Sequence, residues 1–364
     1  MQGKPKLLGI SALPAVGVAA LAFVATAAGT TNASHAKVTR VPGLVEALTL
    51  DGSRIAYDVG GGRNGAKPTA ANKVLVWNVR TGKTIKVSGG QTAAADSTST
   101  GSGVFELALA GSRVAWIINE GGNLEGDDYL FASSLTKPKE RQVTSVMRTG
   151  DNCAGRSQSN CAGQWLGGLV GSGSLIALNR WTTDETGAVV DGELDVLSGT
   201  KLKQVATGAD TVEAASADGG RVAVLRSDGT VALYSSAGSL LRTVSPSSAE
   251  EVALSGHNLV VLTRTRTLEL YNTQTGNRRK TLPVQGSKPG NLGVQGNVAI
   301  YTTGASVHAV NLSNRKDHVI GTLRGGVELA CIDEAGVAYT SSRFFPKGGT
   351  LVFLPFARVA AAVS

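Results

Sequence analysis

Short apolar segments and glycine-centred turns alternate along this chain from residue 48 to residue 339. One unit occurs in seven copies: a short apolar strand, a turn, and a second strand that reads like RIAY, as in LTLDGSRIAY at 48–57. The last four turns are separated by 37, 40 and 40 residues. A repeat of this length with strand signals throughout predicts a β-propeller. The turn glycines are Gly52, Gly111, Gly173, Gly219, Gly256, Gly296 and Gly336.

The strands of the first and last units differ in number. The first unit has four expected strands, at 44–50, 54–59, 73–79 and 84–88. The last has three, at 327–332, 336–341 and 350–354. We expect Lys37–Val41 to supply the missing outer strand, because that pairing would leave no open sheet edge. The predicted fold class is therefore all-β, a single β-propeller over residues 34–364, with seven four-stranded blades closed by the N-terminal outer strand.

Residues 1–33 have the composition of a signal peptide. Lys4 and Lys6 give a positive start, and the stretch 7–28 contains no charged residue. Small residues suitable for cleavage follow, the second set ending at Ala33. We predict export to an extracellular, periplasmic or cell-envelope location, with cleavage before Ser34. An uncleaved anchor is the alternative, because an apolar stretch of this length can also span a bilayer.

Two of the three cysteines bracket a short polar segment. In an oxidising compartment we predict that Cys153 and Cys161 form a disulfide, which would stabilise the fold by roughly 2.5 kcal/mol. A metal site is the alternative, but the neighbouring sequence offers no His or further Cys to complete four ligands. Cys331 lies in an apolar strand and is expected to be a buried thiol.

The first unit resembles a known repeat. Its sequence LTLDGSRIAYDV, followed by KVLVWNVRTGKTIKV, is similar to the WD40-like repeats of TolB-type propellers, in which a DG turn, an RIAY-like strand and an aromatic strand ending in TG follow one another. The resemblance implies a propeller scaffold in which Trp77, Tyr234 and Tyr271 are packing residues. Asn78 stands where a WD40 repeat has Asp. We expect no separate N-terminal domain like that of TolB, so membership of a Tol system is not implied.

Long insertions fall between the second and third strands of a unit, or between units. In an antiparallel four-stranded blade these connections share one face, so we expect them all to decorate that face over the first three blades. They form either a recognition surface or solvated filler. The loop 341–349 joins the same face. Its Arg343, Phe344, Phe345 and Lys347 anchor a partner, or both phenylalanines pack beneath the loop. The insertions span 60–72, 89–103, 120–128, 145–164 and 182–192.

A glutamate recurs near the start of the first strand in five of the units. First strands converge on the propeller axis, so we expect these carboxylates around one mouth of the central channel. There they could attract a cation or an amine, with pKa values raised by crowding. They could instead accept backbone N–H bonds from the neighbouring blade and hold the blades together. The candidate ligand-binding glutamates are Glu46, Glu106, Glu213, Glu251 and Glu328.

Charge limits the classes of partner. The net charge is +8, or +6 without the two lysines of the export segment. Export excludes ordinary nucleic-acid binding, so the expected partner is an envelope protein or an anionic wall polymer. Membrane contact is expected only if the N-terminal segment stays uncleaved.

Catalytic motifs are absent from the sequence, which has no GxSxG, HExxH or P-loop. The four histidines lie in different segments, so they suggest neither a zinc site nor a Ser-His pair. No cofactor, metal or catalytic residue is assigned, and weak calcium binding by the acid-rich stretches 119–128 and 183–195 is the alternative. The sequence favours an exported, non-catalytic propeller that binds a protein or polymer of the cell envelope. The alternative function is a hydrolase or lyase that uses two of the five glutamates as acid and base.

Overall fold

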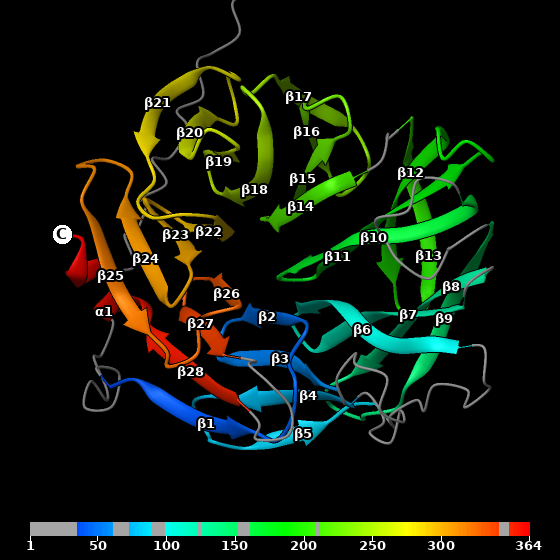
Figure 1. The fold of residues 1–364 in the computed structure, drawn as a ribbon, viewed down its shortest axis with the longest axis horizontal. Coiled ribbons are helices and arrows are strands. Elements are labelled where there is room, and N and C mark those ends of the chain that lie inside the picture. The colour runs from blue at the N-terminus through cyan, green and yellow to red at the C-terminus, as the bar shows by residue number, and fades with distance from the viewer. Residues whose placement is uncertain are drawn as a thin grey trace, which may run out of the picture. The chain divides into compact units, whose positions relative to one another are not determined.

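The computed structural model describes residues 35–60, 73–88, 99–122, 125–150, 161–208, 212–341 and 349–364. They belong to one compact unit, Ser34–Ser364, in which the sheets follow one another around a common centre (Figure 1). Its elements are β-strands, apart from one short helix, α1 (Phe356–Ala362), directly after the last strand. No helix in the described ranges is long and apolar enough to cross a membrane.

Four of the sheets are antiparallel groups of four strands that pair in chain order. Their first turns need glycine, since φ is +59° at Gly52 and +56° at Gly219, a region that side chains disfavour. The four sheets are β2 (Leu48–Asp51), β3 (Arg54–Val59), β4 (Lys73–Asn78) and β5 (Thr84–Lys86); β14 (Val212–Asp218), β15 (Arg221–Arg226), β16 (Val231–Ser235) and β17 (Leu240–Val244); β18 (Ala249–Ser255), β19 (Asn258–Thr263), β20 (Thr267–Asn272) and β21 (Arg278–Pro283); and β22 (Pro289–Gln295), β23 (Val298–Thr303), β24 (Ser306–Asn311) and β25 (Asp317–Thr322).

A fifth sheet combines the start and the end of the described chain. Its order is β1-β28-β27-β26, and β1 runs antiparallel to β28 with Lys37 opposite Phe353 and Val41 opposite Gly349. The predicted pairing of 37–41 with the last unit is therefore confirmed. The strands are β1 (Lys37–Val41), β26 (Leu329–Ile332), β27 (Gly336–Ser341) and β28 (Gly349–Pro355).

The sixth sheet has eight strands, where the sequence predicted two separate four-stranded sheets. Two residue pairs between β9 and β10, Thr149 with Ala162 and Arg148 with Gly163, join the two halves. Only glycine fits there, because a Cβ on Gly163 would lie 2.5 Å from the Met147 carbonyl oxygen. The strands are β6 (Ser99–Ala110), β7 (Arg113–Gly122), β8 (Glu125–Ser134), β9 (Arg141–Thr149), β10 (Ala162–Ser172), β11 (Leu175–Thr183), β12 (Val189–Ser198) and β13 (Lys201–Thr207).

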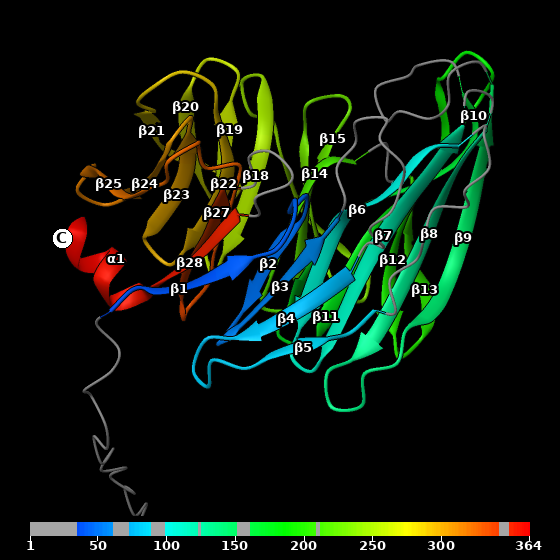
Figure 2. The same ribbon diagram turned by 60° about the horizontal axis from the view of Figure 1, so that its bottom comes forward.

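Most strands of this sheet are longer than those of the other sheets and carry it beyond its neighbours (Figure 2). They contain 7 to 12 residues, compared with 3 to 7 in the other described strands. The expectation of loops at 120–128 and 182–192 is therefore largely wrong, because much of these segments pairs in the ladders of β7, β8, β11 and β12. Of the expected loop at 145–164, residues 145–149 and 162–164 pair in strands, and 151–160 lie outside the described ranges. Pairing satisfies backbone groups that a loop would leave to water. Residues 61–72 and 89–98 lie outside the described ranges.

The first strands of the units meet at the centre. Strand β2 contacts both β6 and β26, which belong to units far apart in the sequence. The remaining contacts join β6 to β10, β10 to β14, β14 to β18, β18 to β22 and β22 to β26.

Apolar side chains fill the space between neighbouring sheets. Ile55 and Trp77 of the first sheet pack with Phe353 of the last one in a single buried cluster. Trp77, Tyr234 and Tyr271 are each 4% exposed, so the packing role implied by the resemblance is confirmed. Burying a side chain of this size contributes about 2 kcal/mol or more, which makes these inter-sheet layers the main source of stability.

Candidate functional site

Two of the predicted glutamates join neighbouring repeat units. Glu106 Oε2 accepts the backbone N–H of Leu169 at 2.6 Å. Glu251 accepts two such bonds, from Asn291 at 3.1 Å and from Leu292 at 2.6 Å. Each acceptor lies on one first strand and each donor on the first strand of the next unit. These carboxylates therefore hold successive units together, Glu106 within the β6–β13 sheet and Glu251 between two sheets, as the second interpretation of the sequence proposed.

A local irregularity accompanies these glutamates. The pairing register shifts between Val104 and Glu106 in β6, and between Ala249 and Glu251 in β18. Such β-bulges bend the strand and redirect side chains, which explains how residues of a first strand reach the first strand of the next unit. Burial raises the pKa of Glu251, and its two backbone N–H bonds oppose that rise.

The other three predicted glutamates lie in different surroundings. The Glu46 carboxylate lies close to the next unit, because a Cβ atom added to Gly103 of β6 would be 3.0 Å from Glu46 Oε2. Glu328 is exposed. Glu213 lies in β14, and its side chain is outside the described part of the structure. The described carboxylates therefore do not share one environment, although they share a repeat position.

A second set of inter-sheet bonds lies at the opposite end of the first strands. Here an Asp or Ser side chain beside the turn between the first and second strands of one unit accepts a hydrogen bond. The donor is the backbone N–H of the turn glycine in the next unit. The pairs are Asp51 with Gly111 at 2.6 Å, Asp218 with Gly256 at 2.6 Å, Ser255 with Gly296 at 3.0 Å, and Asp333 with Gly52 at 2.5 Å. Sequence reasoning missed these residues. The signal was the Asp or Ser that directly precedes Gly52, Gly219 and Gly256.

The first strands surround a small central cavity with a volume of about 280 Å³. Asp51, Asp218, Asp333 and Cys331 are among its lining residues. Cys331 is a free cysteine, and the residue as a whole is only partly buried. Desolvation of its thiol group raises the thiol pKa. In the described ranges no group of three or more His, Cys, Asp or Glu residues is arranged to hold a metal ion. The carboxylates here act as acceptors for the turn glycines.

The structure brings together one hydroxyl–histidine–carboxylate arrangement that the sequence did not suggest. His308 Nε2 lies 3.1 Å from Thr303 Oγ1, and His308 Nδ1 lies 2.9 Å from Asp317 Oδ1. Tyr301 donates its hydroxyl to the other Asp317 oxygen and stacks on the His308 ring at 4.8 Å between centroids. The ring is 6% exposed. Such burial favours a polar brace across β23, β24 and β25 over a site that a substrate reaches.

A buried polar cluster supports the projecting end of the β6–β13 sheet. The Arg148 guanidinium lies 3.1 Å from Asp128 Oδ1 and 4.1 Å from the ring centroid of Trp165, and both charged side chains are fully buried. Trp165 stacks on Trp181 at 6.1 Å and donates its indole N–H to Thr183 Oγ1 at 2.9 Å. Asp128 also accepts the Leu166 N–H at 3.1 Å. These contacts link β8, β9, β10 and β11, so the projection is a rigid extension of the sheet.

The surface of this projection carries acidic side chains and two exposed apolar side chains. Glu120 and Asp127 are direct cross-strand neighbours on β7 and β8. The pKa of each is raised, first by burial and, for Glu120, next by the charge of Asp127. Met147 is 56% exposed and Val190 is 62% exposed. One row of paired residues crosses the sheet from Arg148 through Gly163 and Thr183 to Val189. Met147 and Val190 each lie one residue from that row.

Some predicted site residues lie outside the described residues. Arg343 and Phe344 do, so their role as an anchor stays a prediction. Cys153 does as well, and the disulfide with Cys161 therefore stays a prediction. Cys161 itself is buried beside Trp165 and Trp181.

The chain resembles solved propellers in fold without matching a family. No protein-family model and no curated protein matches it. It is similar to the WD40 β-propeller domain of Doa1, with a TM-score of 0.54 and 13% identity over 89% of this chain and 99% of that chain. The computationally designed Ika8 protein has a TM-score of 0.48 and 12% identity over 86% of this chain and 97% of that chain. The WD40-like propeller prediction is thus confirmed at the level of fold, and the TolB-type assignment stays a prediction.

Proposed function

We propose that this chain is an exported, non-catalytic β-propeller of seven blades that binds a protein of the cell envelope through the projecting end of its β6–β13 sheet. The seven-bladed ring is supported by the contacts of β2 with both β6 and β26, and by the pairing of β1 with β28. The eight-stranded sheet then supplies two of the blades. Export rests on the composition of residues 1–33.

The projection itself is the observation that carries this proposal. Among the described sheets, only β6–β13 contains strands of more than 7 residues. Its distal part is braced by the buried Arg148–Asp128 pair and the Trp165–Trp181 stack. A recognition surface on rigid strands presents its side chains at fixed positions, which lowers the entropic cost of binding.

The chemistry of the projection indicates the kind of partner. Exposed Met147 and Val190 offer apolar contacts. Asp127 is paired with Met147 and with Glu120 on the strands beside it, and exposed Asp191 directly follows Val190. A protein surface with apolar and basic groups complements this pattern. An anionic polymer does not, so protein binding is the favoured form of the envelope role.

Enzymatic use of the glutamates has less support. Glu106 and Glu251 already accept backbone N–H groups from the next unit, so their oxygens are engaged in holding the fold. A general acid or base needs its carboxyl group free to reach a substrate proton.

Cross-linking in the native host tests the proposal. The wild-type chain should give a cross-linked species with one envelope protein, and the double variant Met147→Asp with Val190→Asp should lose it. The matched control is Leu240→Asp with Leu241→Asp on β17, whose side chains are 54% and 44% exposed on another sheet. Equal cross-linking by both double variants would overturn the assignment of the surface. Mass spectrometry of the exported protein should show a chain that begins at Ser34.

A further inference from the structure

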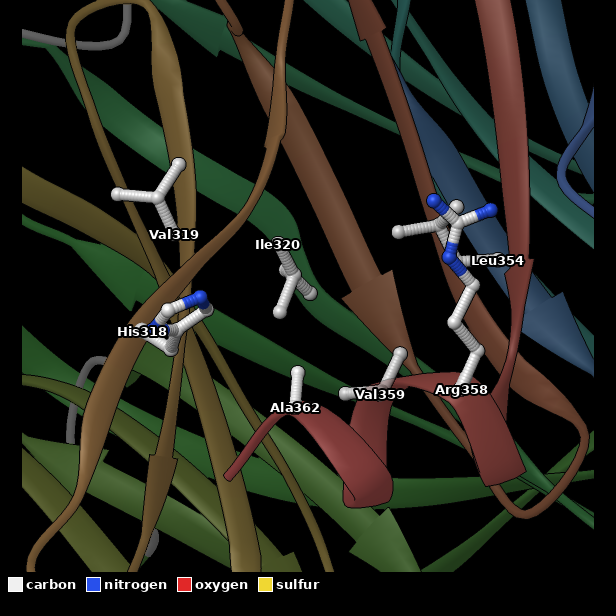
Figure 3. Close-up of a pocket in the computed structure, with 7 residues that line it drawn as sticks. All are labelled: His318, Val319, Ile320, Leu354, Arg358, Val359 and Ala362. Carbon is white, nitrogen blue, oxygen red and sulfur yellow. The ribbon is translucent and has the colours of Figure 1, made fainter. Parts of the chain in front are cut away.

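A second surface feature lies at the outer edge of the β22–β25 sheet, beside α1 (Figure 3). It is a cavity of about 210 Å³, here named the α1 groove. Ile320, Leu354, Val359 and Ala362 give it an apolar lining, and His318 and Arg358 add nitrogen-bearing side chains. The groove is formed by residues of β25, β28 and α1, which come from two different units.

The size of the α1 groove limits its occupant. At about 30 Å³ for each water molecule of liquid, 210 Å³ corresponds to roughly seven waters. Sites for cofactors and drug-sized molecules are typically about 300 Å³ or larger. The groove therefore fits one aliphatic side chain better than it fits a whole small-molecule ligand.

A free strand edge borders the groove. Strand β25 is the last strand of its sheet, and its pairing in the described chain is with β24 alone. One edge of β25 therefore presents backbone N–H and C=O groups that an added strand could pair with. Val319 of this strand is 44% exposed.

The charged side chains that line the groove are basic. Arg358 and His318 are exposed at the groove, and exposed Arg315 lies in the turn that leads into β25, where Lys316 donates to the Ser364 backbone oxygen. The lining contains no carboxylate. The nearby Asp317 is engaged by Tyr301 and His308. The surroundings therefore favour a negatively charged partner.

We propose that the α1 groove binds an acidic peptide segment in extended conformation. The peptide adds to the free edge of β25, places one aliphatic side chain against Val359 and Ala362, and directs its carboxylates toward Arg358 and His318. Backbone pairing then provides affinity, and the pocket and the charges provide specificity. This site is separate from the projection of the β6–β13 sheet and does not depend on the function proposed for it.

Fluorescence anisotropy with a labelled peptide tests this site on the full chain. The probe is a fluorescein-labelled pentapeptide with the sequence Glu-Asp-Leu-Asp-Glu, which should bind saturably and more weakly as salt rises. Ala362→Trp fills the groove and should weaken binding about tenfold, because the leucine side chain is no longer buried. Arg358→Glu should weaken it also. Arg279→Glu on the outer strand β21 is the matched charge control and should leave affinity unchanged.

Two further probes separate the parts of the proposal. A peptide with N-methyl groups at alternate residues cannot pair with a strand edge and should bind more weakly than the parent peptide. The Met147→Asp with Val190→Asp variant should bind the probe normally, so failure here and failure of the projection surface can be told apart. Absence of saturable binding by the wild type, or equal binding by the wild type, Ala362→Trp and Arg358→Glu, would overturn the proposal. Melting curves identify a variant that has not folded.

Discussion

Asp333 and Gly52 are separated by 281 residues, yet Asp333 Oδ2 accepts the Gly52 backbone N–H at 2.5 Å. The other Asp333 oxygen accepts the N–H groups of Ala335 at 2.8 Å and Gly336 at 3.2 Å. One carboxylate therefore shapes its own turn and also fixes the last unit against the first. This junction brings together the two ends of the folded unit.

Replacing Asp333 tests how much that junction contributes. We expect Asp333→Ala to lower the free energy of unfolding by about 1–3 kcal/mol, because three backbone N–H groups lose their acceptor. Chemical denaturation monitored by tryptophan fluorescence measures the change. Glu185→Ala, at an exposed turn residue, serves as the control and should have no measurable effect. Equal stability of the two variants would show that the junction does not stabilise the fold.

The buried carboxyl group of Asp58 predicts a pH dependence. Its Oδ1 accepts the N–H groups of Glu46 and Ala47, and burial outweighs those bonds and raises its pKa from 3.8 to about 8. The folded chain then holds this proton more tightly than the unfolded chain. Stability should therefore be greatest below pH about 4 for this group and fall as pH rises to about 8.

The variant Asp58→Asn isolates this effect, because an amide does not titrate. The slope for one such group is about 1.4 kcal/mol for each pH unit inside the window. Urea unfolding between pH 4 and pH 8 should show a flatter profile for the variant than for the wild type. The raised pKa of Asp333, about 6, acts in the same direction and remains in both proteins. Parallel profiles would contradict the assignment to Asp58.

Two glutamates at the same repeat position should respond differently to substitution. Glu251→Gln replaces one carboxylate oxygen with an amide NH₂ group. One of the two backbone N–H groups that Glu251 binds then faces another donor and loses its acceptor. We expect a loss of about 1–3 kcal/mol in the free energy of unfolding. Glu328→Gln, at the exposed equivalent, should stay within about 0.5 kcal/mol of wild type. Differential scanning calorimetry of the pair checks this, and a larger loss in the Glu328 variant would reverse the assignment.

The facing acids on the projection predict a stabilising substitution. Like charges directly opposite on paired strands are unfavourable, so Glu120→Gln should raise stability at pH 7 by about 0.5 kcal/mol. The pKa of Glu120 is raised in the folded state, so its carboxyl group protonates as pH falls and the gain should disappear near pH 4. Glu185→Gln, at an exposed turn residue, is the control and should change little. A gain that persists at low pH would exclude charge repulsion as its cause.

The sequence predicted the scaffold well because its signals are local. Turn glycines with apolar strands on both sides specify hairpins wherever they occur, and Gly52 and Gly219 adopt the positive φ that such turns need. Lys37–Val41 could be assigned to the last sheet because that unit lacked one strand. The interpretation of glutamates as acceptors between blades was available from their repeat position, and Glu106 and Glu251 confirm it.

The tertiary structure decided which distant groups meet. No sequence pattern showed that β9 and β10 would merge two units, since that contact depends on the close approach of Gly163 to the Met147 backbone. Thr303, His308 and Asp317 meet only through the register of three strands. The α1 groove needs a helix from one unit beside an edge strand of another. Local sequence fixes turns and strands because backbone preference acts over a few residues, whereas register, bulges and packing between units depend on the whole chain.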